Sequence, residues 1–420
     1  MGNTVAIIGG GISGTSMARL LSETHEVTLF ERREKLGGLV SCDQVNGSLF
    51  HKVGGHVFNT KNEEVSEWFW SFFDKQKEFI KAKRNAKIYF QGKYIGYPLE
   101  NHLYQLPRET VKQVIDDLLM VACDNGTKKI DNFDDFLKSN FGNRLYELYF
   151  KPYNAKIWNR DLELIPLEWL DGKLPMPDVS DIITSNFFRK EESEMVHSTF
   201  FYPKKGGSQF IIDRLSKSLN TRISEPIFQI EKIEGKFLLN EQYEFDSVIY
   251  TGDIRSLDEI FQHDSSNLAD AFSSVKSLAS NGTSNVFCET DKTDISWLYL
   301  PGVEYKAHRI IYTGNFSETN NRNGAERKTC VVEFSGIHQE EEMRRQLEHL
   351  PGNLKPLAFN FEKNSYIIHD SSTRRKIQAV KKCIEPLGMY LLGRFAEWEY
   401  YNMDKCIESA MELKKTKFSN

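Results

Sequence analysis

The chain has 420 residues, which is more than one hydrophobic core usually supports, so two or three substructures are expected. Hydrophobic residues make up 40% and charged residues 27%, as in ordinary globular proteins, and the net charge of −5 argues against a nucleic-acid-binding protein. The six cysteines have no metal-ligand or CxxC spacing, and neither a signal peptide nor a membrane-spanning apolar run is present, so we expect a cytoplasmic protein with reduced thiols and no metal site.

The N-terminal residues predict a strand, a helix and a second strand. Residues 5–8 are a short, fully apolar run typical of a buried parallel strand. Residues 12–22 follow as a helix, and residues 27–30 as the next strand. This order predicts the first βαβ unit of a nucleotide-binding domain.

The next third of the chain is predicted to be mainly helical. Residues 65–80 are aromatic-rich and predicted to be helical, and the basic run over 75–84 is interpreted as a solvated helix face, with contact to an anionic ligand as the alternative. Residues 86–98 alternate about Gln91-Gly92, which predicts a hairpin. Helices follow over 103–169, with an amphipathic stretch at 111–122.

Strands dominate the second half. The expected elements are an aromatic strand at 200–202, a helix at 208–219, strands broken at Glu234-Gly235 and at 240–242, further strands over 286–334, and a last strand from Met389 that leads to a helix at 404–413.

The order of these elements predicts an α/β fold, in which a Rossmann-like domain holds an inserted helical domain and a mixed or antiparallel sheet domain for the substrate. The expected boundaries are 1–83, 204–275 and 366–420 for the nucleotide-binding domain, 84–203 for the inserted hairpin and helices, and 276–365 for the antiparallel sheet.

The segment from Gly9 to Gly14 is a GxGxxG motif between an apolar strand and a helix. Gly9 would form the tight turn, Gly11 would let a pyrophosphate approach the backbone, and Gly14 would let helix and strand pack closely. Glu31 ends the second strand, where a carboxylate binds a ribose hydroxyl. The alternative is a glycine-rich turn without a ligand.

A second glycine pair, Gly37-Gly38, follows in REKLGGLV, directly after this acid. The arrangement resembles the FAD-binding fold of the flavin amine oxidases, the protoporphyrinogen oxidases and the UDP-galactopyranose mutases, and it implies FAD as the cofactor. In that group the pair flanks the FAD pyrophosphate.

The stretch GGHVFNT resembles the mutase segment that passes beside the flavin ring. The resemblance implies that Gly55 lets the backbone approach the flavin and that His56 lies near its reactive edge. The alternative is a histidine satisfied at the end of a strand.

Three further segments resemble the mutases. In YNAKIWNRDLELIP, Tyr153 and Trp158 stand where a tyrosine and a tryptophan line the sugar-nucleotide cleft. In AHRIIYTGNFS, Arg309 stands where an arginine binds the diphosphate. In LLGRFAEWEYYNMDKCIESA, Arg394 stands beside the flavin and Tyr400 at the substrate phosphate, with Asp404 starting the last helix.

Other matches are looser. Tyr366 matches another cleft tyrosine, and Lys173 is nearest to a second mutase arginine. SVIYTGDI resembles the strand that returns to the FAD domain, with Asp253 where a proline is usual. The alternatives are that the aromatic residues belong to the core and that the arginines form surface ion pairs.

The resemblance implies a full set of FAD-binding residues: Gly9, Gly11, Ser13, Gly14, Glu31, Arg32, Gly37, Gly38, Gly55, His56, Ile227, Thr251, Gly252, Gly393, Arg394, Asn402 and Met403. It implies three catalytic residues, His56, Arg309 and Tyr400, and four substrate-binding residues, Tyr153, Trp158, Lys173 and Tyr366.

The implied function is interconversion of pyranose and furanose forms of a nucleotide sugar through an adduct at flavin N5, for cell-surface polysaccharide synthesis. The partner is a nucleotide-sugar substrate, with no nucleic acid and no membrane span, and a homo-oligomer is left open. The segment FFYPKKGGSQF resembles the oxidase relatives, so hydride transfer to FAD is the alternative. A third hypothesis is a protein that binds FAD structurally and acts through a partner.

Overall fold

A parallel sheet forms the centre of the part of the molecule that is predicted to bind a nucleotide. The computed structural model describes residues 3–123, 129–167, 178–190 and 198–419. The order of this five-stranded sheet is β19-β13-β1-β2-β9, with bounds Met389–Leu391, Ser247–Tyr250, Thr4–Ile8, Glu26–Glu31 and Thr221–Ile223. The predicted first strand, helix and second strand are therefore confirmed within one or two residues.

The two faces of this sheet bury different cores, because successive side chains of a strand point to opposite sides. Val5 and Ile7 of β1 pack in one core with helices α1 (Ile12–Leu21), α2 (Glu63–Ser71), α8 (Gln209–Leu215) and α13 (Met403–Lys417). Ala6 faces the other core, which contains residues of β10 (Ile230–Ile233), β11 (Lys236–Leu239), β12 (Tyr243–Phe245), α9 (Leu257–Ile260), α10 (Ser266–Val275) and α12 (Thr373–Ile384). Layers on both faces leave the carboxyl edge of the sheet for a ligand.

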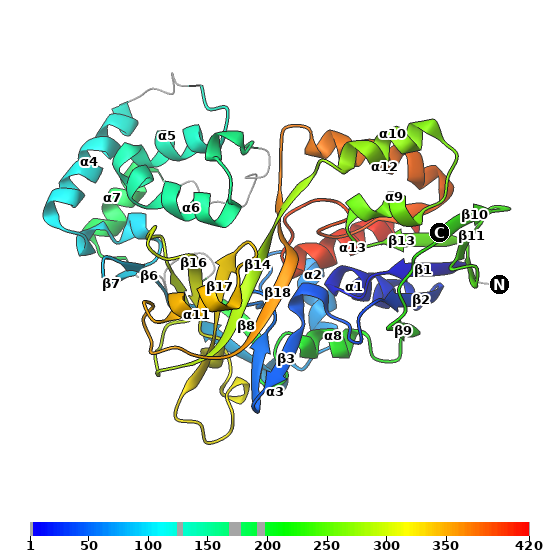
Figure 1. The fold of residues 1–420 in the computed structure, drawn as a ribbon, viewed down its shortest axis with the longest axis horizontal. Coiled ribbons are helices and arrows are strands. Elements are labelled where there is room, and N and C mark those ends of the chain that lie inside the picture. The colour runs from blue at the N-terminus through cyan, green and yellow to red at the C-terminus, as the bar shows by residue number, and fades with distance from the viewer. Residues whose placement is uncertain (1–2, 124–128, 168–177, 191–197, 420) are drawn as a thin grey trace.

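A second, seven-stranded sheet forms the middle of the molecule. Its order is β18-β14-β17-β16-β15-β6-β7, with bounds Lys355–Ile368, Ala279–Thr290, Lys328–Ser335, Ala307–Ile311, Trp297–Tyr299, Ala86–Phe90 and Lys93–Gly96. Its neighbouring strands are antiparallel except β15 and β6. The long strands β14 and β18 run from this sheet toward α10 and α12, as Figure 1 shows, and so connect it to the part that contains the parallel sheet.

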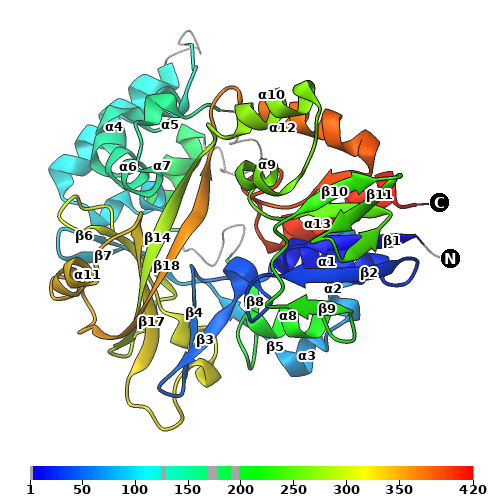
Figure 2. The ribbon, with the colours of Figure 1, turned by 45° about the vertical axis from the view of Figure 1, so that its right-hand side comes forward.

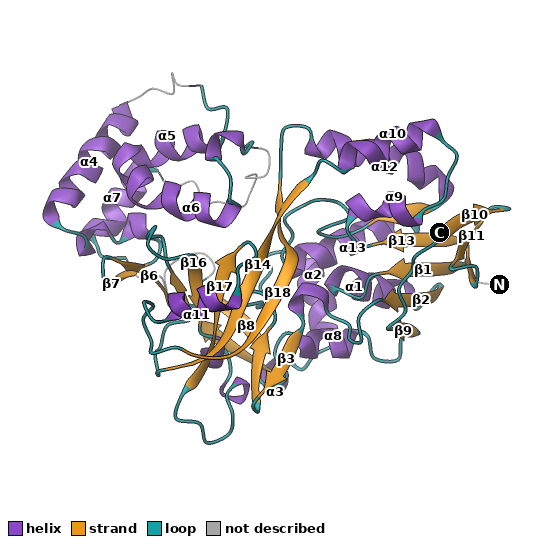
Figure 3. Cartoon of the chain, viewed as in Figure 1, coloured by secondary structure: helices purple, strands orange, loops and turns teal. Residues whose placement is uncertain are grey.

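Helices form a separate group beside the second sheet (Figures 2 and 3). They are α4 (Arg108–Cys123), α5 (Phe133–Leu145), α6 (Lys151–Trp158) and α7 (Val179–Phe187). Helix α6 follows a π-helical turn over Tyr146–Phe150. One hydrophobic core joins this group to the sheet, because Trp158 of α6 packs in it together with Tyr299 of β15 and Tyr366 of β18. The predicted cleft aromatics therefore lie where the helical group meets the sheet.

One predicted element is wrong and others were missed. Residues 65–80 are not one helix: α2 ends at Ser71, a short helix α3 spans Lys75–Glu78, and Phe79–Lys83 is strand β5. The Asp74 side chain caps α3, and β5 pairs with the aromatic strand β8 (Thr199–Pro203). Half of the basic run over 75–84 therefore lies in a β-strand and not on a helix face. The helix expected at 208–219 ends at Leu215, and α10, α11 (Glu340–Leu347) and α12 were not predicted.

Among the residues that the structure describes, no helix has the length and apolar character needed to cross a membrane. The hairpin predicted about Gln91-Gly92 is present as β6 and β7. A second hairpin, β3 (Cys42–Val45) with β4 (Ser48–His51), precedes the loop that carries His56.

Candidate functional site

A cavity of about 460 Å³ lies at the carboxyl ends of β1, β2 and β13. Its walls include the loop after β1, the residues after Glu31, and Thr251-Gly252 after β13. This is the edge at which open parallel α/β sheets bind nucleotides. The volume is within the usual range for ligand pockets, about 300–1,000 Å³.

The glycine motif forms one wall of this cavity. Gly9 has φ +110°, and its amide donates to the carbonyl of Phe30 at 2.8 Å. A Cβ at Gly14 would lie 2.0 Å from the Gly9 carbonyl oxygen, so only glycine permits this approach of helix and strand. A Cβ at Gly11 would meet nothing within 4 Å, because Gly11 faces the cavity.

The second glycine pair packs directly against the first motif. The amide of Gly37 donates to the Gly10 carbonyl at 2.8 Å, and a Cβ at Gly38 would be 3.3 Å from the Gly11 Cα. Both residues have positive φ, +132° and +54°. The two segments thus form a continuous backbone wall, in which a side chain at Gly38 would press against Gly11.

Glu31 anchors this wall. One carboxylate oxygen accepts the Gly10 amide at 2.8 Å, and the other accepts the Arg33 amide at 2.9 Å. Because a carboxylate oxygen can accept more than one hydrogen bond and each Glu31 oxygen accepts one here, Glu31 keeps acceptor capacity toward the cavity that it lines. This arrangement fits the predicted contact with a ribose hydroxyl.

Two buried nitrogens on the cavity wall lack partners among the described residues: His56 Nε2 and Arg394 Nε. Burial lowers the pKa of His56 to about 4, and the charge of Arg394 acts in the same direction, so the imidazole is neutral near pH 7. The N-terminus of α13 contributes Asn402 and Met403 to the same wall. Unpartnered polar atoms, a helix N-terminus and glycine walls fit the flavin and pyrophosphate of FAD.

Most of the predicted cofactor residues line this cavity: Gly9, Gly11, Ser13, Glu31, Arg32, Gly37, Gly38, His56, Ile227, Thr251, Gly252, Arg394, Asn402 and Met403. Gly14, Gly55 and Gly393 do not line it. A Cβ at Gly393 would lie 2.4 Å from Ser13 Oγ, so this glycine, like Gly14, shapes the wall from behind.

Part of the lining carried no sequence motif. Arg33 forms an ion pair with Glu362 of β18 at 2.9 Å, and both side chains line the cavity. Asn364 of β18 donates to Asp253 at 3.0 Å, and both residues also line it. Strand β18 therefore contributes to the cofactor cavity as well as to the second sheet, a contact that no local sequence pattern predicts.

The two glycines before His56 have different roles. Gly54 has φ +62°, and a Cβ there would be 3.5 Å from Arg309 Nη2, 3.6 Å from His56 Nε2 and 3.8 Å from Glu333 Oε2. A Cβ at Gly55 would instead lie 2.6 Å from Ile311 and 3.2 Å from the Phe316 ring. Gly55 therefore packs closely on β16 and does not line the cavity, and its approach to the flavin stays a prediction. Gly54 is the glycine that lies among polar groups.

A second histidine holds the His56 loop. His51 is fully buried; its Nδ1 accepts the His56 amide at 3.3 Å, and its Nε2 is 2.7 Å from the Tyr202 hydroxyl. Burial lowers the pKa of His51 to about 3. Because the amide is a donor, Nδ1 is the acceptor and the ring proton is on Nε2. Tyr202 belongs to FFYPKKGGSQF, so this segment supports the loop.

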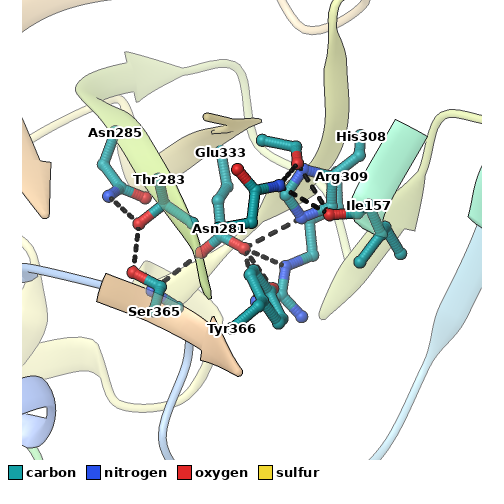
Figure 4. Close-up of polar contacts among 11 residues, drawn as sticks. Ile157, Asn281, Thr283, Asn285, His308, Arg309, Glu333, Ser365 and Tyr366 are labelled. Atoms are coloured by element: carbon teal, nitrogen blue, oxygen red, sulfur yellow. Dashed lines mark hydrogen bonds and ion pairs between the residues drawn. The ribbon is translucent and has the colours of Figure 1, made fainter. Parts of the chain in front are cut away.

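A buried carboxylate, Glu333 of β17, is the centre of the polar contacts in Figure 4. Its Oε1 accepts hydrogen bonds from Arg309 Nε at 3.0 Å, Arg309 Nη2 at 2.6 Å, His308 Nε2 at 2.9 Å and the Tyr366 hydroxyl at 2.8 Å. Its Oε2 accepts the Gly54 amide at 2.9 Å. Burial alone would raise the pKa of Glu333, but Arg309 and the hydrogen bond from His308 outweigh it and hold the pKa well below the usual range.

Arg309 is therefore not a surface ion-pair residue. Glu333 holds the edge formed by Nε and Nη2, and Tyr366 also contacts Nη2, at 3.1 Å. The side chain is 22% exposed. Its charge is matched by a buried anion, and neither Glu333 nor His308 was recognised from the sequence.

Three of the predicted cleft aromatics, Trp158, Tyr366 and Tyr400, form one cluster. The Trp158 ring lies 6.3 Å from Tyr366 and 6.4 Å from Tyr400, and the two tyrosine rings stack at 6.2 Å. Arg394 lies over the Tyr400 ring at 4.1 Å, which links this cluster to the cofactor cavity. Tyr153 stands apart, edge-on to Tyr299 at 5.7 Å. Tyr153 and Trp158 also pack in the shared core, as the core-aromatic interpretation expects, and their role in binding stays a prediction.

Two predicted residues need separate mention. Lys173 lies outside the residues that the structure describes. Asp404 is the second residue of α13, which begins at Met403, and burial raises its pKa. No group of three or more His, Cys, Asp and Glu side chains in the described part of the chain is placed to hold a metal ion.

Residues 7–75 match the family model of an NAD(P)-binding Rossmann-like domain. A dTDP-fucopyranose mutase from Escherichia coli is 29% identical over 181 residues, a match that covers 41% of this chain and 46% of that protein. A UDP-galactopyranose mutase from Mycoplasma genitalium is 22% identical over 425 residues, and this match covers 96% of this chain and 92% of that protein.

Solved structures show the same fold. A crystal structure of reduced UDP-galactopyranose mutase superimposes with a TM-score of 0.88 at 18% identity, over 100% of this chain and 95% of that one. A protein from Exiguobacterium that carries the name protoporphyrinogen oxidase has a TM-score of 0.75 at 15% identity, over 99% of this chain and 98% of that one. The sequence relatives, the matched nucleotide-binding model and the cavity bear out the prediction of an FAD-dependent enzyme that resembles UDP-galactopyranose mutase.

Proposed function

We propose that this protein is a mutase that interconverts the pyranose and furanose forms of a nucleotide sugar, with FAD bound in the cavity described above. One observation carries the proposal. Arg309 Nη2 and the unpartnered His56 Nε2 lie 3.5 and 3.6 Å from the same point, the position of a Cβ on Gly54. The Arg309 guanidinium, a group suited to a diphosphate, therefore lies next to His56 on the wall of the cofactor cavity.

FAD in its reduced state would supply the nucleophile, its N5 atom, for the anomeric carbon of the sugar. The chain would supply charge and placement. Arg309, oriented by Glu333, would bind the diphosphate as it leaves. Tyr400 would donate its hydroxyl to a sugar or phosphate oxygen. The Tyr366 hydroxyl, whose proton is donated to Glu333, would accept a hydrogen bond from a sugar hydroxyl, and the neutral His56 would offer its Nε2 to the flavin or to a sugar hydroxyl.

The aromatic cluster would exclude water from the sugar. Trp158 and Tyr366 are buried, and their rings meet near Tyr400 at the boundary between the helical group and the second sheet. A dry site strengthens the attraction between Arg309 and a phosphate. The proposed substrate class is a nucleoside diphosphate sugar, in keeping with the names of both curated relatives.

The oxidase hypothesis has less support. The segment FFYPKKGGSQF, which favoured it, places Tyr202 on His51 and Ser208 on the Val40 carbonyl. Tyr202 thereby supports the His56 loop through His51, Ser208 supports the segment after Gly37-Gly38, and neither residue lines the cofactor cavity. The protoporphyrinogen oxidase likeness shows only the fold, so hydride transfer is kept as an outcome of the test. A purely structural role of FAD would be indicated by an inert protein that still binds FAD.

The experiment compares the amount of product formed with the amount of reductant supplied. The purified holoprotein is reduced with a limiting amount of dithionite and incubated with UDP-galactofuranose or dTDP-fucofuranose without air. A mutase should form product far beyond one equivalent of reductant. Stoichiometric consumption of an electron acceptor with an amine or a porphyrinogen, and no change in either nucleotide sugar, would contradict the proposal and favour an oxidase.

A further inference from the structure

The strand that carries Arg309 contains an irregularity next to the proposed cleft. Strand β16 pairs with β17 through Ala307 and Phe334 and then through Arg309 and Glu333. His308 is therefore an extra residue, so two residues of β16 oppose one of β17, as in a β-bulge. In a regular strand, neighbouring side chains point to opposite faces. Here both His308 and Arg309 contact Glu333 Oε1, which Figure 4 shows.

The protonation state of His308 follows from its partner. An ionised carboxylate only accepts hydrogen bonds, so His308 Nε2 must be the donor across the 2.9 Å contact. His308 Nδ1 is buried and has no partner among the described residues, so a proton there would be unsatisfied. Burial lowers the pKa of His308, opposed by Glu333, and the ring is the neutral Nε2–H tautomer.

A buried acceptor without a partner is costly, so a gain elsewhere should offset it. Glu333 is fully buried, and its carboxylate contacts both Arg309 and the loop that carries His56. Its Oε1 holds the Arg309 guanidinium, and its Oε2 holds the Gly54 amide, two residues before His56. Any rotation of this carboxylate would move Arg309 and the His56 loop together.

We propose that His308 is a positioning residue: from the bulge of β16 it fixes the Glu333 carboxylate, which in turn sets both Arg309 in the cleft and the His56 loop at the FAD cavity. The part of the inference in which His308 sets Arg309 in the cleft rests on the proposed function. The part in which His308 sets the His56 loop rests on the cofactor cavity alone. His308 would touch neither substrate nor cofactor.

The test compares His308→Phe, which keeps a flat ring and removes the donor, with His308→Gln, which keeps an N–H donor. Hydrogen exchange of residues 52–57 in the FAD-free protein reports the Gly54 hydrogen bond directly. The FAD absorbance spectrum and reduction potential of the holoprotein report the His56 loop, and neither measurement needs a substrate. Titration with UDP, followed by flavin absorbance, reports Arg309.

For His308→Phe we expect at least tenfold faster exchange at Gly54, a shifted flavin spectrum, and roughly tenfold weaker UDP binding. A tenfold change in the preference for reduced over oxidised FAD would shift the two-electron potential by about 30 mV. His308→Gln should restore most of each property. If His308→Phe fails to fold, the same three readouts on His308→Gln and His308→Asn, which places its amide nearer the backbone, decide: the Asn variant should be impaired and the Gln variant should not.

The inference is overturned if the foldable variants keep wild-type exchange at Gly54 and a wild-type flavin potential, or if His308→Gln is as impaired as His308→Phe. Failure of the proposed function has a different signature. In that case the wild-type protein does not respond to UDP, while exchange and potential still differ between His308→Phe and the wild type.

Discussion

The pair of glycines before His56 allows a test with a built-in control, because Gly54→Ala and Gly55→Ala add the same methyl group to neighbouring positions. At Gly54 the methyl carbon would lie 3.5 to 3.8 Å from Arg309, His56 and Glu333, which is ordinary contact. The cost there comes from the φ of +62°, about 1–2 kcal/mol for an L-residue. At Gly55 it would lie 2.6 Å from Ile311, and such overpacking costs about 1–3 kcal/mol.

The two variants should therefore lose similar thermal stability and differ in function. In Gly54→Ala the methyl group would lie beside both His56 Nε2 and the Arg309 guanidinium and hinder the approach of a ligand to them. We expect kcat/KM for the nucleotide sugar to fall at least tenfold, equivalent to about 1.4 kcal/mol of transition-state stabilisation. Gly55→Ala should retain kcat/KM within about twofold once folded, because its methyl group points at β16.

The assay combines thermal unfolding, followed by the fluorescence of released FAD, with product formation by the dithionite-reduced enzyme well below the melting temperature. Circular dichroism before each assay shows that both variants are folded. Wild-type kcat/KM in Gly54→Ala, or an equal loss in Gly55→Ala, would refute the assignment of Gly54 to the site and of Gly55 to packing.

Three further outcomes follow from the contacts. Gly11→Val should abolish FAD binding while the FAD-free protein keeps its melting temperature, since a Cβ there meets only the cavity; Gly14→Val, 2.0 Å from a carbonyl, should not fold. Both are measured by flavin absorbance and circular dichroism. The pKa of His51 is about 3 when folded, so its stabilisation is present above pH 6.5 and is lost as the pH falls toward 3. His51→Gln should thus flatten the dependence of the unfolding free energy on pH between 6 and 4.5, by up to about 1.4 kcal/mol per pH unit. Finally, Arg309→Ala should destabilise the protein by roughly 3–5 kcal/mol in urea unfolding, and adding Glu333→Gln should recover most of the stability but not the UDP binding.

Much of the nucleotide-binding part was predictable because its requirements are local. A short apolar run, a glycine at a defined turn and an acid at the end of the next strand are all written within residues 5–31. The second glycine pair lies close by, and its packing on Gly11 completes the wall. The C-terminal contributions of Arg394 and Asn402 were predicted by resemblance alone, since no local pattern connects them to residues almost 400 positions earlier.

The polar centre of the cleft was not predictable in the same way. Glu333 meets Arg309 only because β16 and β17 pair in one register, and His308 reaches it only because that register is interrupted. The apolar pattern of one strand reveals neither the register in which it pairs with its neighbour nor the position of a bulge. The error at residues 65–80 has a related cause. Strand β5 is stabilised by pairing with β8, more than a hundred residues away, and the spacing of aromatic residues within 65–80 does not reveal that pairing.

The charge balance of the site changes how Arg309 should be understood. The resemblance alone suggests a free cation awaiting a diphosphate, but Arg309 and Glu333 form a pair whose net charge is zero. A phosphate arriving at this pair would meet a fixed, oriented guanidinium, and its attraction would depend on direction more than on net charge. Within the described residues Arg394, over the Tyr400 ring, has no ion-pair partner, so an unbalanced positive charge lies at the wall of the cofactor cavity. Such a distribution favours a negative charge that develops beside the cofactor, as the proposed departure of a nucleoside diphosphate requires.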